Sequence, residues 1–151
     1  MFSKASEYAI RATLYIAQKS TEDKKLGIDE IAKAIDSPRS FTAKILQVLT
    51  RDHKIISSSR GPNGGFYLSP DAGNLPVMVI LEVMGEDAIL KKCVLGLQLC
   101  SEVKPCPMHD RYKHIKEALI ELFNTRTIHH LANDMRSGDV FVSNRKGRKK
   151  K

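Results

Sequence analysis

The amino-acid sequence predicts a mainly α-helical fold that carries a small β-hairpin. Three observations support this fold class: apolar residues recur at helical spacing in several segments, Asn63-Gly64 stands between two short β-type runs, and a long amphipathic stretch follows the cysteines. Asn-Gly is a dipeptide typical of hairpin turns. With 151 residues and 42% hydrophobic content, the chain is long enough for one compact domain with an appended oligomerisation element.

Three helices are expected in the first third of the chain. Lys4 to Lys19 places its apolar residues on one broad face, and Ile28 to Ile35 follows the i, i+3, i+4, i+7 pattern with acidic residues in its first turn. The third helix is expected to be capped by Ser37, to start at Pro38 and to reach about His53. Its buried face is expected to be Phe41, Ile45, Val48 and Leu49.

A hairpin and a fourth helix are expected next. The hairpin joins an Ile55-Ile56 run to a run from Phe66 to Leu68 through a glycine-rich loop. The fourth helix is expected to begin near Pro76 and to end at Gly85, because glycine is a frequent helix C-cap.

A long helix from Met108 to about Asn124 and a short one from about Ile128 to Met135 complete the predicted fold. The apolar stripe of the long helix lies far along the chain from the N-terminal helices. A second subunit is therefore the expected packing partner, with Leu119 and Leu122 buried between two copies of the chain.

Charge and composition exclude several function classes. Most of the net charge of +8 comes from the basic tail after Asn144, so overall basicity is weak support for a nucleic-acid partner. No apolar stretch is long enough to cross a bilayer and no signal peptide is recognisable, so we expect a cytoplasmic protein without a membrane partner. No Cys-x-x-Cys pair or nucleophile–base arrangement is present, so we expect neither an enzyme nor a small-molecule substrate.

The order of elements predicts a winged helix-turn-helix that binds double-stranded DNA. Two short helices joined by a tight turn, the second with a polar and cationic face, suit the major groove, and the hairpin would be the wing. Arg60 is the expected minor-groove probe. The candidate DNA-binding residues are Arg39, Ser40, Thr42, Lys44, Gln47 and Arg51 on the recognition helix, and Arg60, Asn63 and Gly64 in the wing.

The three cysteines point to a metal. Six residues separate Cys93 from Cys100, five separate Cys100 from Cys106, and two separate Cys106 from His109. Thiolates and imidazole are soft ligands that suit iron-sulfur clusters and zinc, and the close cysteine pair common in zinc sites is missing. An iron-sulfur cluster is favoured, and zinc and uncoordinated thiols remain as alternatives.

Several short sequences carry a family resemblance. They are Tyr8-Ala9, Ile31-Ala32, Ser40-Phe41, the stretch Arg60-Gly61-Pro62-Asn63-Gly64-Gly65-Phe66, and the three-cysteine segment before a long helix. Along nearly its whole length apart from the basic tail, the chain resembles the IscR/NsrR family of winged helix-turn-helix, iron-sulfur-cluster transcriptional regulators.

The resemblance implies a homodimer with crossed long helices, a cluster on the three cysteines, and DNA affinity that changes with cluster state. It implies two candidates for the fourth ligand. His109 would complete a two-iron cluster, and Glu7 of the partner subunit would complete a four-iron cluster. Ala43 departs from the family pattern, because IscR-like members carry there a glutamate that discriminates operator classes.

Together these expectations describe a DNA-binding transcriptional regulator that binds a palindromic operator and senses iron-sulfur status, redox conditions or nitric oxide. We expect this regulator to be a repressor. The alternatives are a regulator of the same fold with zinc or a thiol redox switch at the cysteines, and a cluster carrier or adaptor that does not bind DNA. The expected division is 1–70 for the winged helix-turn-helix, 71–92 for a linking helix, 93–109 for cluster binding, 108–136 for dimerisation and 137–151 for a basic, disordered tail.

Overall fold

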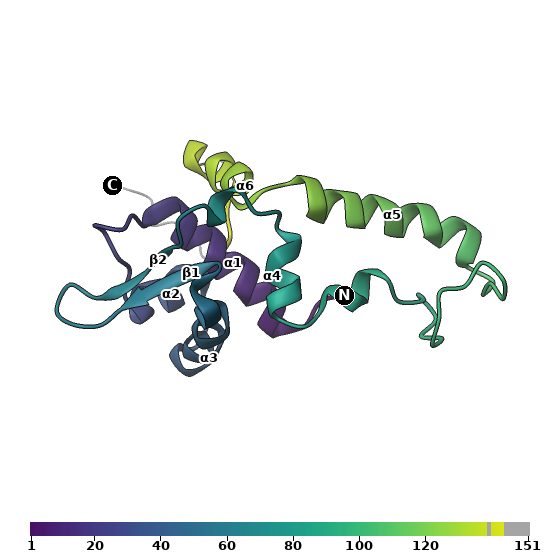
Figure 1. The fold of residues 1–151 in the computed structure, drawn as a ribbon, viewed down its shortest axis with the longest axis horizontal. Helices are drawn as coiled ribbons and strands as arrows, with labels where there is room; N and C mark the ends of the chain where they lie inside the picture. The colour runs from purple at the N-terminus through teal and green to yellow at the C-terminus, as the bar shows by residue number, and fades with distance from the viewer. Residues whose placement is uncertain (139, 144–151) are drawn as a thin grey trace, which may run out of the picture.

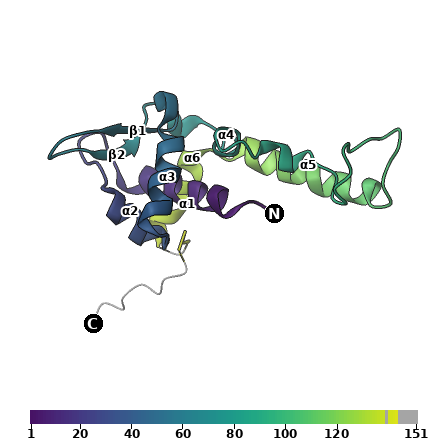
Figure 2. The same cartoon turned by 90° about the horizontal axis from the view of Figure 1, so that it is seen from below.

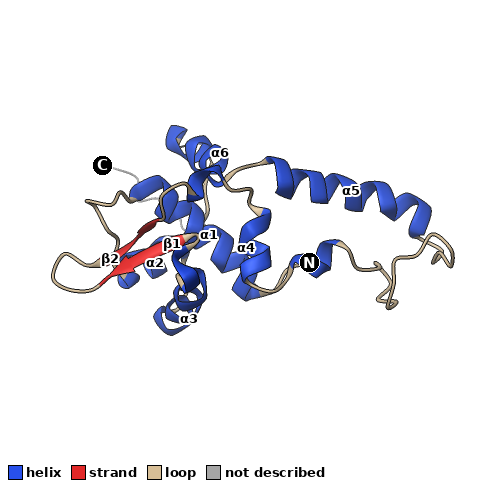
Figure 3. Cartoon of the chain, in the orientation of Figure 1, coloured by secondary structure: helices blue, strands red, loops and turns tan. Residues whose placement is uncertain are grey.

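The fold consists of a helical body and one long arm (Figure 1). The computed structural model describes residues 1–138 and 140–143, so most of the basic tail expected over 137–151 lies outside the described residues. Figure 3 shows that helices dominate the body and that the β-structure is confined to one hairpin at its edge. This agrees with the predicted fold class. No described helix is long and apolar enough to span a membrane.

The central element of the body is α1 (Lys4–Lys19), which has the bounds that the sequence predicts. Its inner face is tightly packed, because Ala9, Ala12 and Ile16 have no exposed surface. Ser3 caps the helix by accepting a hydrogen bond from the backbone N–H of Ser6 at 3.1 Å. The helix contacts α2, α3, α4, α6 and the hairpin, and so forms the axis on which the body assembles.

The helix-turn-helix consists of α2 (Ile28–Ile35) and α3 (Arg39–Leu49). The expected cap of α3 was wrong, because Ser37 belongs to the end of α2. The Ser37 N–H donates to the carbonyl of Ala32 at 2.9 Å, and Asp36, the residue before it, has a left-handed backbone with φ 56°. Pro38 therefore occupies the cap position of α3.

The expected end of α3 near His53 was also wrong. The helix stops at Leu49, where the Thr50 hydroxyl donates to the carbonyl of Leu46 at 2.8 Å, and a 3-10 turn (Arg51–His53) follows. Asp52 and His53 have φ values of 60° and 49°, which no α-helix can accommodate.

The buried face of α3 is turned by about one residue from the expected one. Ile45 and Leu49 are buried as expected, whereas Phe41 and Val48 are only half-buried, and Thr42 and Leu46 take the remaining inner positions. Phe41 instead packs edge-on against the Tyr8 ring of α1, with ring centroids 5.5 Å apart.

The hairpin pairs β1 (Ile56–Ser59) with β2 (Gly65–Leu68) in antiparallel register, with Ile56 opposite Leu68. Leu26 pairs with the other edge of β2 through two backbone hydrogen bonds of 2.8 Å to Phe66. This added bridge anchors the hairpin to the loop before α2, so the wing and the helix-turn-helix form one unit.

The remaining elements link the body to the arm. A short 3-10 turn (Ala72–Asn74) precedes α4 (Met78–Val83), which starts two residues later than expected, and another (Asp87–Leu90) follows it. The chain then runs out along the arm and returns as α5 (His109–Thr125), before α6 (Ile128–Asp134) and a last 3-10 turn (Met135–Ser137) pack back on the body.

The N-terminal half of α5 lies along the cysteine segment and not on the body. Both views show α5 projecting from the body with the cysteine segment beside it and a loop at the far end (Figures 1 and 2). Only its C-terminal half meets the body, where Leu119, Ile120 and Phe123 contact a small core of Met78, Leu81 and Leu90. Ile115 and Leu122 remain 56% and 52% exposed.

Candidate DNA-binding surface and cysteine site

The outer side of α3 presents polar and cationic side chains to solvent. Ser40, Lys44 and Gln47 follow one another at helical spacing and are exposed, and Arg51 continues the same direction in the 3-10 turn. Hydroxyl, amide and ammonium groups are the donors and acceptors that read base edges and phosphates. We call these four residues the α3 surface.

Thr42, which was expected among the DNA-binding residues, does not lie on this surface. It has no exposed surface, and its hydroxyl donates to the carbonyl of Pro38 at 2.9 Å. Its position in the first turn of a short helix makes it look like an outward residue in the sequence, but the one-residue rotation of the buried face turns it inward.

Arg39 differs from the other cations of this region because it has an acidic partner. Its Nε donates to Asp29 of α2 at 2.6 Å, and the two side chains are 66% and 78% exposed. A pair so exposed contributes at most about 1 kcal/mol. Arg39 can therefore exchange Asp29 for a phosphate at low cost. The pairing connects two helices, which is why the sequence pattern of α3 alone does not reveal it.

The wing tip is a five-residue loop from Arg60 to Gly64. Arg60 and Asn63 are exposed and project beyond the paired strands, and the left-handed residue is Gly61, with φ 104°, rather than Asn63. A Cβ on Gly64 would lie 2.4 Å from the carbonyl oxygen of Ser59. This glycine is thus required by the closure of the wing itself.

The three thiols lie in the segment that leads into the N-terminus of α5. Cys93 is buried, Cys100 and Cys106 are half-buried, and all three are unbridged. The side chain of Cys106 helps to lower the pKa of the Cys93 thiol. Backbone N–H groups, first that of Leu95 and then those of Leu97 and Gly96, hold the pKa of the Cys93 thiol below its usual value, against the opposing effect of burial.

Cys100 belongs to a second pair with His109. The Nδ1 atom of His109 lies 3.5 Å from the Cys100 sulfur, and the Lys116 ammonium donates to the same sulfur at 2.7 Å. His109 is the one buried residue of α5, 6% exposed, and its buried Nε2 atom has no hydrogen-bond partner among the residues that the structure describes. Lys116 was missed in the sequence because a lysine on an amphipathic helix looks like an ordinary solvent residue.

The donor set fits an iron-sulfur cluster in its chemistry. Three thiols and one imidazole lie in one short segment, and the unpartnered Nε2 of His109 is the kind of buried donor atom that a metal would satisfy. The thiols stand as two separate pairs, and within residues 1–138 and 140–143 no group of three ligands converges on one point. Cluster binding would thus require the Cys93–Cys106 and Cys100–His109 pairs to close on each other.

Glu7, the alternative fourth ligand, is an exposed residue in the first turn of α1. This end of α1 lies on the side of the body from which the arm departs (Figure 1). A carboxylate there is also favoured by the helix dipole, so its presence alone does not require a cluster.

Comparison with known proteins gives a consistent result over nearly the whole chain. Residues 2–134 match the profile of the Rrf2 family, described as iron-dependent transcriptional regulators. The chain is 31% identical over 135 residues to a protein of Aquifex aeolicus described as a helix-turn-helix-type transcriptional regulator, with 88% of this chain and 92% of that protein covered. It is 28% identical over 133 residues to the transcriptional regulator IscR of Klebsiella pneumoniae, covering 88% and 80%.

Among solved structures, CymR, the global cysteine regulator of Bacillus subtilis, superposes with a TM-score of 0.70 over 89% of this chain and 97% of that one. The two sequences are 17% identical, so this likeness shows a shared fold.

Proposed function

Since this chain belongs to the Rrf2 family of transcriptional regulators, we propose that it acts as a cytoplasmic homodimer that binds a palindromic operator and adjusts its DNA affinity through an iron-sulfur cluster. The single observation that carries the cluster is the buried Nε2 of His109, which lacks a hydrogen-bond partner among the described residues, on a ring that contacts the Cys100 thiol. The chain is a regulator and not an enzyme.

The DNA-binding half of the proposal rests on the α3 surface and the wing. Gln47 and Ser40 offer hydrogen-bonding groups for base edges, and Lys44 and Arg51 offer cations for phosphates. Arg60, exposed at the wing tip, would enter the adjacent minor groove, which attracts arginine side chains. A dimer would present this surface twice, which suits an operator with two half-sites.

The homodimer is supported by the unpartnered part of α5. Ile115 and Leu122 are more than half exposed, whereas Leu119, Ile120 and Phe123 of the same helix pack on the body. Apolar side chains at helical spacing on an arm suit a second copy of the same arm, because a two-fold axis brings identical faces together. The exposed Val94, Leu95 and Leu97 of the cysteine segment extend the same apolar character along the arm.

The residues proposed to hold the cluster are Cys93, Cys100, Cys106 and His109, with Glu7 of the partner subunit as the alternative fourth ligand. A bound cluster supplies reversible electron transfer and sensitivity to oxidants and nitric oxide. The chain itself would offer the thiolates and would connect the cluster site to α5. The buried Cys93 and His109 would keep the site partly shielded from solvent.

Coupling to DNA would follow from where the site sits on the arm. His109 is the first residue of α5, and Cys93 follows the 3-10 turn that α5 contacts. Joining the Cys93–Cys106 and Cys100–His109 pairs would therefore fix one end of the arm. A change in the arm would alter the spacing of the two α3 surfaces in the dimer. A ligand can shift DNA affinity only by favouring one of two such arrangements.

Anaerobic purification followed by visible absorption and by iron and sulfide counts tests the proposal. A coloured protein with iron and acid-labile sulfide in equal amounts is expected, and Cys93→Ala, Cys100→Ala and Cys106→Ala should each lose the colour. Full cluster content in all three variants would contradict the assignment. A colourless protein that contains zinc would support the zinc alternative instead.

A thiol redox switch is the second candidate, favoured by the contact between Cys93 and Cys106 and by the lowered pKa of the Cys93 thiol. Oxidation by hydrogen peroxide would join these two sulfurs, with two thiol protons and two electrons passing to the peroxide to form two waters. The fold shared with CymR leaves this chemistry open for the chain.

Mass spectrometry of metal-free protein after peroxide treatment discriminates the two candidates. A Cys93–Cys106 disulfide that forms rapidly and changes DNA affinity would support the switch. If peroxide yields no disulfide while cluster loss changes DNA affinity, the cluster is the sensor. Cys100→Ala is the matched control, because it leaves the Cys93–Cys106 pair in place.

A further inference from the structure

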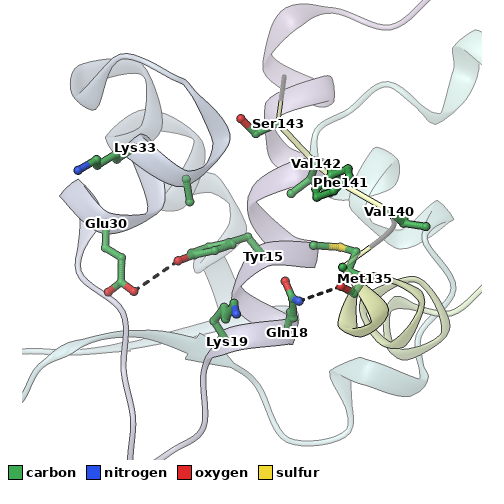
Figure 4. Close-up of a pocket in the computed structure, with 12 residues that line it drawn as sticks. Tyr15, Gln18, Lys19, Glu30, Lys33, Met135, Val140, Phe141, Val142 and Ser143 are labelled. Atoms are coloured by element: carbon green, nitrogen blue, oxygen red, sulfur yellow. Dashed lines mark hydrogen bonds between the residues drawn. The ribbon is translucent and has the colours of Figure 1, made fainter. Parts of the chain in front are cut away.

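The lysine residues of this chain differ in what their ammonium groups meet. Figure 4 shows Lys19 and Lys33 on the wall of a hollow of about 540 Å³ between α1 and α2, where no hydrogen bond is drawn to either ammonium group. Both of these residues are exposed. Lys116 of α5 is half-buried instead, and its ammonium group donates to the Cys100 sulfur at 2.7 Å. Lys116 therefore has a specific partner in the cysteine segment.

Lys116 and His109 hold Cys100 against one face of α5. The two residues are about two helical turns apart, so their side chains project from the same face of the helix. The Nδ1 atom of His109 lies 3.5 Å from the Cys100 sulfur that Lys116 contacts. The Lys116 ammonium group also donates to the carbonyl of Lys91 at 3.5 Å. It thus joins α5 both to Cys100 and to the chain just before Cys93.

The positive charge of Lys116 faces a sulfur atom rather than a carboxylate. Lys113 lies between His109 and Lys116 on α5, and it forms an ion pair with Glu102. Among the residues that the structure describes, no carboxylate forms an ion pair with Lys116. Lys113 is consequently a suitable comparison for Lys116, because both carry the same charge on the same part of α5 but have different partners.

A cation that donates to a ligating sulfur affects the reduction potential of an iron-sulfur cluster. Reduction adds one electron and therefore negative charge, part of which the sulfur atoms carry. Hydrogen bonds to these sulfurs and the net charge around them set the potential, and charge-assisted hydrogen bonds are stronger than neutral ones. An ammonium group at Cys100 would favour the reduced form and so raise the potential.

We propose that Lys116 is a positioning residue of the cluster site: it holds Cys100 on α5 and donates to its sulfur, which raises the reduction potential of the bound cluster. The step is the transfer of one electron from an external one-electron donor to the cluster, and no bond of the protein forms or breaks. This inference rests on the proposed cluster and deepens it, because it names a residue that sets the potential at which the regulator would respond.

A redox titration of protein reconstituted with iron and sulfide tests this role. Reduced viologen dyes donate the electrons, and visible absorption reports the oxidised and reduced fractions at each potential. At the midpoint potential of the parent, Lys116→Met should lower the ratio of reduced to oxidised cluster about tenfold, which is about 59 mV for a one-electron couple. Lys116→Arg should restore most of the potential, because a guanidinium group also carries a positive charge and N–H donors.

Lys113→Met is the matched control, because it removes the same charge from α5 without removing a contact with sulfur. It should shift the potential by much less than Lys116→Met does. Loss of the cluster from Lys116→Met, with normal retention in Lys116→Arg and Lys113→Met, would also support the role, since it would show that the cation keeps Cys100 at the site.

Two outcomes would overturn the inference. A Lys116→Met protein with the parent's potential would show that the contact with Cys100 does not affect the cluster, and an equal shift in Lys113→Met would show that only the overall charge of α5 matters. Either result leaves the cluster itself in place. A parent protein that binds no iron would instead contradict the proposed function.

Discussion

A buried ring nitrogen without a hydrogen-bond partner costs about 1–3 kcal/mol of desolvation, and the Nε2 of His109 is such an atom. From the sequence, His109 is one of five histidines and its position after Cys106 is only suggestive. Burial separates it from His114, which is exposed on the next turn of α5. The sequence could not predict this, because burial of the arm depends on how the returning chain covers α5.

His109→Leu should leave protein prepared without iron at least as stable as the parent. The substitution removes the unpartnered nitrogen and keeps an apolar side chain in the buried position. In protein reconstituted with iron and sulfide, the same change should bleach or alter the visible spectrum. Urea unfolding and absorption measure the two effects, and His114→Leu should change neither. A loss of more than about 1 kcal/mol without iron would mean that His109 contributes to packing instead.

Gln47→Ala and Arg51→Ala should have different effects on DNA binding. Gln47 lies at the centre of the α3 surface, so its loss should lower the preference for operator over random DNA, by about 1–3 kcal/mol if it pairs with a base. Arg51 lies past the end of α3, so its loss should weaken both kinds of binding equally and flatten the salt dependence. Titrations with both DNAs at several salt concentrations separate the two effects. Unchanged operator preference in Gln47→Ala would exclude this residue from base reading.

At the scale of elements, periodicity predicted α1 and α2 with their bounds but overran the end of α3. Residues 50–53 contain no glycine or proline that would mark the end of a helix, and the left-handed backbone at Asp52 and His53 has no counterpart in the pattern of apolar residues. The rotation of the α3 face has the same origin. Whether Phe41 or Thr42 points inward depends on Tyr8 of α1, a contact between helices far apart in the sequence.

The wing shows the same limit. The hairpin was predicted from Asn63-Gly64, but the bridge from Leu26 to Phe66 joins segments forty residues apart and appears only in the folded chain. It also explains why Gly65 is required, because a Cβ there would lie 2.6 Å from the carbonyl oxygen of Leu26.

Gly64→Ala should therefore disturb the wing through packing. The added methyl group would overlap the carbonyl oxygen of Ser59, and overpacking of this kind costs about 1–3 kcal/mol. We expect a lower melting temperature or a locally opened wing, together with weaker DNA binding. Thermal unfolding and amide hydrogen exchange across the hairpin check this. Ser58→Ala, an exposed change in the same hairpin, should be neutral, and equal behaviour of the two variants would refute the steric argument.

At the scale of the whole molecule, the arm is the part that the single chain leaves incomplete. Leu119 was expected between subunits but packs partly on its own chain, against the small core of α4 and the 3-10 turn that follows it. Ile115 and Leu122 carry the exposed apolar surface instead. The sequence predicted the amphipathic stripe but could not divide it between the body and a partner, because both surfaces are apolar.

Ile115→Asp should convert the proposed dimer to monomers. Its side chain is 56% exposed in the single chain, so a charge there should leave the fold intact. In a dimer seam, the same charge would be desolvated without a partner, at a cost of several kcal/mol. Operator affinity should collapse with the loss of the second α3 surface, even though the winged helix-turn-helix is unchanged. Sedimentation and operator titration measure the two effects.

The same variant decides between the two fourth ligands. A monomer that keeps its cluster would assign the site to His109 within one chain, whereas a monomer that loses it would assign the site to Glu7 across the dimer. Glu117→Lys is the control, because it changes a charge on the opposite, solvent side of α5 and should leave assembly unaffected. A dimeric Ile115→Asp protein with normal operator binding would show that α5 is not the seam, and the subunits would then have to meet through the cysteine segment or the body.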